Sequence, residues 1–237
     1  MNIIITICAR GGSKGIPGKN IKPINKVPLI GYSIIVAKQF AEKYKADIAL
    51  STDSDEIKNA ARQLGVATDY KRPDEFATDK AGKMDAIRHV KEYYETSLNK
   101  KYDLLLDLDV TSPLRTLQDL EEGMQIILND PNCLSLFSVN PAKRNPYFNM
   151  VEKGENGYYR VIKKLEGNFL TRQSAPKVYD LNASFYFYKK VFFEQGLNFA
   201  ITERSLIYEM KHICFDLDEV EDFDYMEYLL ETKKWLF

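Results

Sequence analysis

The chain begins with Met1–Cys8, MNIIITIC, and runs directly into Ala9–Asn20, ARGGSKGIPGKN; these two stretches decide the fold. The first is an almost continuous β-branched run, which is typical of a strand buried on both faces of a parallel sheet. The second is rich in glycine and basic residues. Open α/β sheets bind ligands beyond the carboxyl ends of their strands, so we expect this loop to lie at a binding site.

Strand-like and helix-like segments alternate along most of the chain, which predicts βαβ units. The expected fold class is α/β, a three-layer, mostly parallel sheet with helices on both faces, in a single domain over residues 1–237. The expected strands cover 1–8, 46–53, 102–110, 133–139, 182–188 and 212–218, and the expected helices cover 29–42, 55–64, 83–94, 116–128 and 220–230.

The alternation breaks over residues 140–180, which are rich in Pro, Lys, Tyr and Gly. We interpret this segment as an inserted β-rich lobe with short strands near 148–151 and 158–162. It carries many aromatic residues but is too small for a core of its own. Such a lobe usually buries its apolar side chains against a partner, so it predicts a homodimer.

The overall charge is balanced, with 33 Lys and Arg against 34 Asp and Glu. This balance gives no reason to expect nucleic acid or a membrane surface as a partner. No stretch approaches the ~18 apolar residues of a membrane span, and the N-terminal run is too short for a signal peptide. Three cysteines in apolar segments are typical of buried thiols in a reducing compartment, so we expect a soluble, cytoplasmic protein.

The loop after the first strand fits neither familiar phosphate-binding pattern. Ser13 stands where a Walker loop needs glycine, Asn20 stands where it needs Ser or Thr, and the dinucleotide-binding glycine pattern is absent. Glycines nevertheless let backbone N–H groups approach an anion, and Arg10 and Lys19 can donate charge-assisted hydrogen bonds. The loop therefore predicts a triphosphate site, with an ordinary flexible surface loop as the alternative.

A second cluster is FDLD, which places Asp216 and Asp218 near the end of an expected strand. Residues i and i+2 of a strand share a face, so the two carboxylates would repel each other unless a cation lay between them. Mg²⁺, or Mn²⁺ in its place, is the expected cation because it binds a few carboxylates together with phosphate oxygens. The alternative is a solvated acidic turn before the last helix.

Taken together, these residues resemble the acylneuraminate cytidylyltransferases, or CMP-sialic acid synthetases, including their legionaminic and pseudaminic acid-type members. The resemblance covers essentially the whole chain, and its blocks stand in the family's order. They are ARGGSKGIPGKN at 9–20, STD at 51–53, RPDEFATD at 72–79, TSPLR at 111–115, LNASFY at 181–186, YEM at 208–210 and FDLDEVEDF at 215–223.

The resemblance implies a Rossmann-like nucleotidyltransferase fold and transfer of CMP from CTP to a nine-carbon 2-keto sugar acid, with release of pyrophosphate. It implies catalytic roles for Arg10, Lys19 and Asp218, and the family also uses the Asp216–Asp218 pair for metal. It further implies nucleotide binding by Ala9, Gly11, Ser13, Asn20, Arg72, Asp79, Ala81 and Thr111, and sugar binding by Asp109, Ser112, Arg115, Arg172, Gln173 and Asn182. Arg172 and Gln173 would belong to the lobe that reaches the neighbouring subunit.

Two positions depart from the family's pattern. Lys83 stands where many relatives carry a small polar residue, and Asp109 stands where relatives specific for N-acetylneuraminic acid carry glutamine. An ionised aspartate only accepts hydrogen bonds, whereas a glutamine amide also donates them. We therefore expect Asp109 to select the sugar acid or to join the metal, with an ion pair to Arg115 as the alternative.

Two other functions remain open from the sequence alone. Asp107-Leu108-Asp109 and Asp216-Leu217-Asp218 both resemble the D-x-D that holds the metal of a glycosyltransferase. A catalytically inactive nucleotide-binding relative is the other possibility. We find no nucleophile–base pair, which favours direct in-line transfer, and the sugar acid can be N-acetylneuraminic, legionaminic or pseudaminic acid.

Overall fold

A computed structural model describes residues 1–12, 15–78, 80–164 and 174–236. The chain divides into two compact units. One contains Met1–Ser138 and Asn182–Phe237, and the other contains Val139–Leu181.

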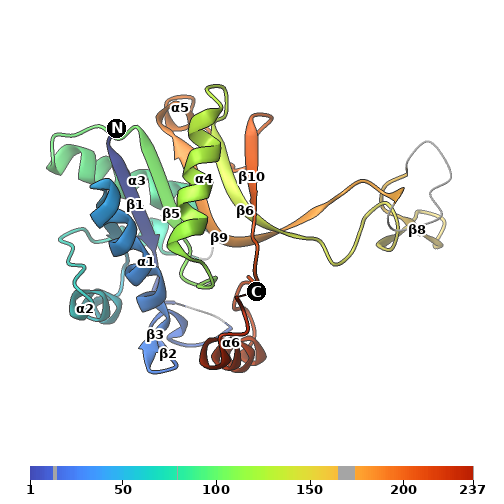
Figure 1. Cartoon of the computed structure of the whole chain (residues 1–237), viewed down its shortest axis with the longest axis horizontal. Helices are drawn as coiled ribbons and strands as arrows, with labels where there is room; N and C mark the ends of the chain where they lie inside the picture. Colours follow the sequence, from blue (N-terminus) through green and yellow to red (C-terminus); the bar gives the residue numbers. More distant parts are fainter. Residues whose placement is uncertain (13–14, 79, 165–173, 237) are drawn as a thin grey trace. The chain divides into compact units, whose positions relative to one another are not determined.

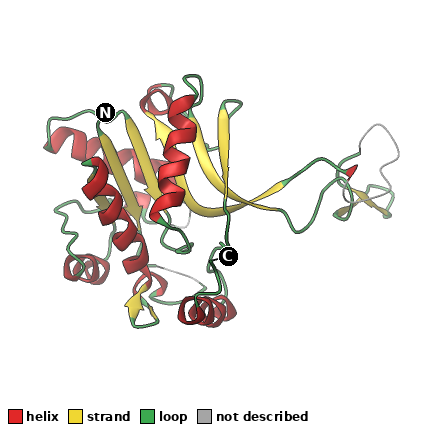
Figure 2. Ribbon diagram, in the orientation of Figure 1, coloured by secondary structure: helices red, strands yellow, loops and turns green. Residues whose placement is uncertain are grey.

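The larger unit is built on a six-stranded mixed sheet in the order β10-β6-β9-β5-β1-β4 (Figures 1 and 2). β1 (Ile3–Cys8) lies between β4 (Asp47–Ser51) and β5 (Leu104–Leu108) and is parallel to both. β9 (Tyr179–Lys189) runs antiparallel to β5. The expected α/β class is confirmed, with this antiparallel strand as the departure from a parallel sheet.

Helices cover both faces of the sheet because β1 is apolar on both sides. Ile3, Ile5 and Ile7 belong to a core shared with α1 (Leu29–Tyr44) and α4 (Leu117–Asn129). Ile4 points the opposite way, into a second core shared with α3 (Lys83–Ser97). The strand period of two thus separates the two layers of helices.

Three further elements agree with expected segments to within a few residues: α2 (Asp55–Gln63), β6 (Ser135–Pro141) and α6 (Val220–Thr232). The short helix α5 (Lys190–Glu194) was not expected from the sequence. Short elements complete the large unit: the 3₁₀ turns Lys19–Ile21 and Asp74–Phe76, and the hairpin of β2 (Pro23–Ile24) and β3 (Val27–Pro28).

The strand expected over 212–218 is wrong, because these residues, all of them described, form no strand. The last strand of the sheet is instead β10 (Ser205–Glu209), which precedes this segment. Residues 212–218 are held by individual contacts, such as the bond from the Leu217 N–H to the Thr111 carbonyl at 2.9 Å. Asp216 and Asp218 are therefore not placed side by side by a strand, as the sequence had suggested.

The smaller unit contains the antiparallel pair β7 (Val151–Lys153) and β8 (Tyr159–Val161). Its large apolar side chains are conspicuously exposed, and Tyr158 and Tyr159 reach 77% and 69%. The other exposed ones are Phe148, Met150, Val151, Ile162, Tyr179 and Leu181. Within the described residues of the whole chain, no helix is both long and apolar enough to cross a bilayer.

Candidate active site

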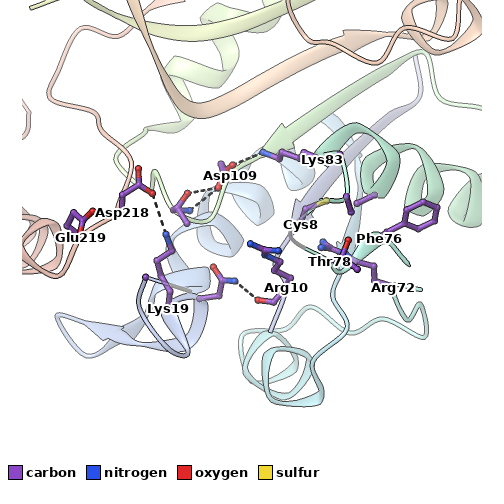
Figure 3. A pocket seen from close by; sticks show the side chains of 16 residues that line it. Cys8, Arg10, Lys19, Arg72, Phe76, Thr78, Lys83, Asp109, Asp218 and Glu219 are labelled. Carbon is purple, nitrogen blue, oxygen red and sulfur yellow. Dashed lines mark hydrogen bonds and ion pairs between the residues drawn. The ribbon is translucent and has the colours of Figure 1, made fainter. Parts of the chain in front are cut away.

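Loops from β1, β4 and β5 meet at one edge of the sheet, because these parallel strands all end there. They enclose a cavity of about 630 Å³ (Figure 3). Eight of the residues expected at the site line it: Arg10, Lys19, Asn20, Arg72, Ala81, Asp109, Thr111 and Asp218. Its lining includes the cationic side chains of Arg10, Lys19, Arg72 and Lys83 and the carboxylates of Asp109, Asp218 and Glu219.

The glycine-rich loop forms one wall. The Asn20 side-chain amide donates to the Arg10 carbonyl at 2.9 Å and so closes the loop on itself. Gly15 approaches the neighbouring segment so closely that a Cβ on it would lie 3.1 Å from the Asp218 backbone oxygen. Of the other expected nucleotide residues, Ala9 is buried and the Gly11 N–H donates to Asp53 at 2.9 Å, beside a smaller adjoining pocket.

Arg72 forms the opposite wall. Its guanidinium donates to the hydroxyl and the carbonyl of Ser51 at the end of β4, at 2.9 and 2.7 Å. Phe76 and Thr78 continue this wall into a less charged end of the cavity. Neither was expected from the sequence, although both fall within the block RPDEFATD. Of the expected site residues, Ser13, Asp79, Arg172 and Gln173 lie outside the described residues.

The segment before α6 supplies the acidic wall. Lys19 Nζ lies 2.5 Å from the Leu217 carbonyl oxygen and 3.8 Å from Asp218 Oδ1. The Asp222 carboxylate accepts the N–H groups of Asp218 and Glu219 at 2.8 and 2.7 Å, which fixes the backbone at the start of α6. Asp218 is therefore held in place while its side chain stays exposed.

Asp216 lies beside this wall but does not line the cavity. Burial raises the pKa of its carboxyl, and the charges of Asp109 and Asp218 raise it further. Its Oδ1 atom is buried and has no hydrogen-bond partner among the described residues. A buried carboxylate oxygen next to other carboxylates is a site that favours a cation.

The two departures from the family's pattern turn out to be ion-pair partners. Lys83 Nζ lies 2.6 Å from Asp109 Oδ2 and 2.8 Å from Asp107 Oδ2 (the Asp109 contact is drawn in Figure 3). Burial alone would raise the pKa of Asp109, but the ammonium of Lys83 and the hydrogen bonds from Thr111 together outweigh burial and lower it to about 2. Asp109 is thus an ionised, already paired carboxylate.

Asp109 makes no ion pair with Arg115, so that alternative is wrong. Arg115 Nη2 donates instead to the Asp109 backbone carbonyl at 2.6 Å. The guanidinium is buried and also bonds the Ser184 carbonyl and the Ser33 hydroxyl. Burial lowers the pKa of Arg115 to about 10.

Three residues expected to bind the sugar are buried and line neither this cavity nor the next in the described part of the chain. They are Ser112, Arg115 and Asn182. Ser112 contacts the thiol of Cys214 at 3.4 Å, and Asn182 accepts the Ser138 hydroxyl at 2.6 Å. These residues shape the wall behind the site.

A second cavity of about 430 Å³ adjoins the first and shares Gly82 and Lys83 with it. Its lining is mostly apolar and includes Tyr186, Tyr188 and Phe199. The sequence marks this cavity only weakly, through the alternating aromatics of β9. The site therefore has a charged compartment and an apolar one, with Lys83 at the boundary.

A buried polar network holds the segment that leads to Asp216 and Asp218. His212 Nε2 lies 2.9 Å from Asp119 Oδ2, and the Tyr208 hydroxyl donates to Asp119 Oδ1 at 2.9 Å. Asp119 also caps α4 through Thr116. The segment that carries Asp216 and Asp218 is thereby attached to a helix of the core.

Comparisons with known proteins identify relatives of this chain. A cytidylyltransferase family model matches residues 3–234. A Campylobacter coli protein named post-translational flagellin modification protein B is 39% identical over 98% of this chain and 96% of its own length. A Campylobacter jejuni protein named CMP-N,N'-diacetyllegionaminic acid synthase is 40% identical with the same coverage of both chains.

A more distant relative and a solved structure extend the comparison. N-acylneuraminate cytidylyltransferase A of Danio rerio is 33% identical over 89% of this chain and 46% of its own. CMP:2-keto-3-deoxy-manno-octonic acid synthetase complexed with CTP aligns with a TM-score of 0.69 over 98% of this chain and all of its own. At 16% identity, that structure supports the fold alone.

The His212–Asp119 pair gives a testable pH dependence. Burial opposes protonation of His212, but the hydrogen bonds to Asp119 and to the Ile213 backbone, together with the charge of Asp119, outweigh it and raise the pKa of His212. A raised folded-state pKa adds stability below the unfolded value of about 6.5, and this stability is lost as pH rises through the folded pKa. We expect His212→Gln to lower the unfolding free energy by roughly 1–3 kcal/mol near pH 5.5 and by less near pH 8.5. Urea denaturation at the two pH values measures this, and an equal loss at both would contradict it.

Proposed function

The chain belongs to the cytidylyltransferase family, and from this premise we propose that it transfers CMP from CTP to the anomeric hydroxyl of a nine-carbon 2-keto sugar acid, releasing pyrophosphate. The relatives named for legionaminate and N-acylneuraminate products support an N-acylated acid of that type. The observation that carries the proposal is the pairing of a cation-bordered cavity with an adjoining apolar one.

The charged cavity suits a nucleoside triphosphate. Arg10 and Lys19 come from the glycine-rich loop and border the end next to Asp218, where the phosphates would lie. Phe76, Thr78 and Ala81 border the less charged end, where the base and ribose would lie. Hydrogen-bond donors fixed before the reaction stabilise the charge that develops on the phosphates during transfer.

The residues present fit a divalent cation such as Mg²⁺. No cluster of three or more His, Cys, Asp or Glu side chains that could hold an ion exists among the described residues. Mg²⁺ needs no such cluster, because it binds through one or two carboxylates and completes its shell with water and phosphate oxygens. Asp216, with its unpaired buried oxygen, and Asp218 would hold it, and the ion would neutralise charge on the phosphates.

The apolar cavity suits the sugar acid. It adjoins the charged cavity at Gly82 and Lys83, so an acid lying there would be next to bound CTP. Tyr186 and Phe199 offer apolar surface for acyl and carbon-chain groups. Cys8, which lines the charged cavity, has its thiol pKa raised to about 12 by burial and by Asp107, so it is not a thiolate nucleophile.

The glycosyltransferase alternative loses its support. The first D-x-D carboxylates, Asp107 and Asp109, are occupied by Lys83 rather than open to a metal. The matching family model is that of the cytidylyltransferases, and one relative that matches over nearly its full length is named a CMP-N,N'-diacetyllegionaminic acid synthase. If the chain were a catalytically inactive relative, it would bind CTP without turnover. The next experiment distinguishes this case from an active enzyme.

The experiment that tests the function is pyrophosphate release from CTP and Mg²⁺ with a panel of acids. N-acetylneuraminic, legionaminic and pseudaminic acids form the panel, and product formation is checked by mass. We expect turnover with at least one acid and none without an acid. CTP binding with no pyrophosphate from any acid would reject the proposal.

The metal assignment is tested with Asp218→Asn. Losing one carboxylate at the cation should lower kcat/KM by roughly two orders of magnitude, since a metal supplies several kcal/mol of charge stabilisation. Asp224→Asn, on the exposed face of α6, is the matched control and should behave like wild type. An Asp218→Asn enzyme with wild-type kcat/KM at limiting Mg²⁺ would contradict the assignment.

We also propose that the enzyme is a homodimer joined through the unit Val139–Leu181. Eight large apolar side chains of this unit are exposed, and exposed apolar clusters of this kind mark protein interfaces.

The dimer is tested by light scattering at micromolar protein. Wild type should have the mass of two chains, and the double substitution Tyr158→Ser/Tyr159→Ser should shift it toward one, because it removes the most exposed apolar surface of the unit. Leu98→Ser, at a 51% exposed position of the larger unit, is the control and should leave the mass unchanged. A monomeric wild type would refute the proposal.

A further inference from the structure

We propose that Lys83 binds the sugar acid directly, donating a hydrogen bond from its ammonium to a neutral oxygen of that substrate, and that Asp107 and Asp109 hold the ammonium in position. This inference rests on the proposed function, because it concerns the second substrate of the same reaction. It changes the role of Asp109 from a reader of the sugar to a positioning residue.

The carboxylates of Asp107 and Asp109 already have partners within the protein, whereas the Lys83 ammonium has a donor left for a ligand. Asp109 Oδ1 accepts the N–H and the hydroxyl of Thr111 at 3.1 and 2.8 Å, and its Oδ2 accepts Lys83. Asp107 is fully buried and accepts the Thr6 hydroxyl at 2.7 Å on its other oxygen. Both carboxylates are therefore engaged within the protein.

Lys83, in contrast, keeps a donor for a ligand. An ammonium has three N–H groups, and two of them suffice for the two carboxylates. Its side chain is 39% exposed, and Nζ lies 5.3 Å from the centre of the Tyr186 ring, on the wall of the apolar cavity. Lys83 lines both cavities, so its remaining donor lies where the two substrates meet.

The net charge of Lys83, Asp107 and Asp109 determines which substrate group Lys83 can bind. Two carboxylates and one ammonium carry a net charge of −1, so the cluster as a whole repels the substrate's own carboxylate and the CTP phosphates. A hydroxyl or an acyl carbonyl accepts a hydrogen bond without this repulsion. An N-acylated sugar acid offers both groups.

The burial of this cluster also explains why the lysine must accompany the aspartate. Without Lys83, Asp109 would line the cavity without its ion pair beside two anionic substrates, and the buried Asp107 would lose its ion pair as well. The effect of removing Lys83 therefore has two parts, lost charge balance and a lost donor. A test must separate them.

Steady-state kinetics of Lys83→Met, Asp109→Asn and their double variant make this separation. We expect Lys83→Met to raise KM for the sugar acid at least about tenfold, as loss of a charged hydrogen bond implies, with KM for CTP changed less than about twofold. Asp109→Asn removes the charge imbalance that Lys83→Met would create. The double variant has the same net charge as wild type but lacks the donor, so its sugar-acid KM should stay about fivefold or more above that of wild type.

Two outcomes overturn the proposal. If the double variant matches wild type, Lys83 only balances charge; if KM for CTP rises as much as KM for the acid, Lys83 serves the nucleotide. Lys101→Met is the matched control, since Lys101 forms a comparable 2.8 Å pair with Glu95 on the surface. Should Lys83→Met not fold, Lys83→Arg, which keeps the charge but changes the donor geometry, must show the same split between the two KM values.

Failure of this inference is distinguishable from failure of the proposed function. The function fails only if wild-type protein gives no pyrophosphate with any acid of the panel. The inference is judged on variants of an active enzyme, with calorimetric CTP binding as the check that each variant retains its nucleotide site.

Discussion

The parallel pairing of β1 with both of its neighbours is the constraint on which the site depends. β4, β1 and β5 all end at one edge, so the loops that follow them must share the space beyond it. Arg10, Arg72 and Asp109 reach the same cavity from segments that are distant in sequence. No single loop has enough charge or shape to bind a triphosphate and a sugar acid together, and the register of three strands assembles the site.

Much of this arrangement is predictable from local pattern. The β-branched run of β1 and the helical spacing of α1 depend on near neighbours in the chain, so their positions follow from the sequence. The segment 212–218 has the composition of a strand, but its backbone bonds to Thr111 and its histidine bonds to Asp119 instead of pairing in the sheet. Whether an apolar segment pairs with a sheet depends on tertiary contacts that no local pattern records.

The site was predictable in its residue types but not in its pairings. Arg10, Lys19 and Asp218 line the cavity, although Asp218 comes from a segment that is not a strand. The Lys83–Asp109 pair joins residues 26 positions apart, and only the packing of α3 against the sheet brings them together. Arg115 looked like a ligand-binding residue, yet the backbone carbonyls at the end of β5 need a buried donor, and it supplies one.

That buried arginine has a consequence for how this enzyme can diversify. Arg115 holds position 109 by its main-chain oxygen and makes no bond to its side chain. That bond does not depend on which residue stands at position 109, although the Asp109 side chain itself also accepts the Thr111 N–H. Under the proposed function, a change at position 109 balanced by a matching change at position 83 would alter which acid is accepted. The bond from Arg115 that holds the backbone at position 109 is thus separate from the side chains that face the cavity.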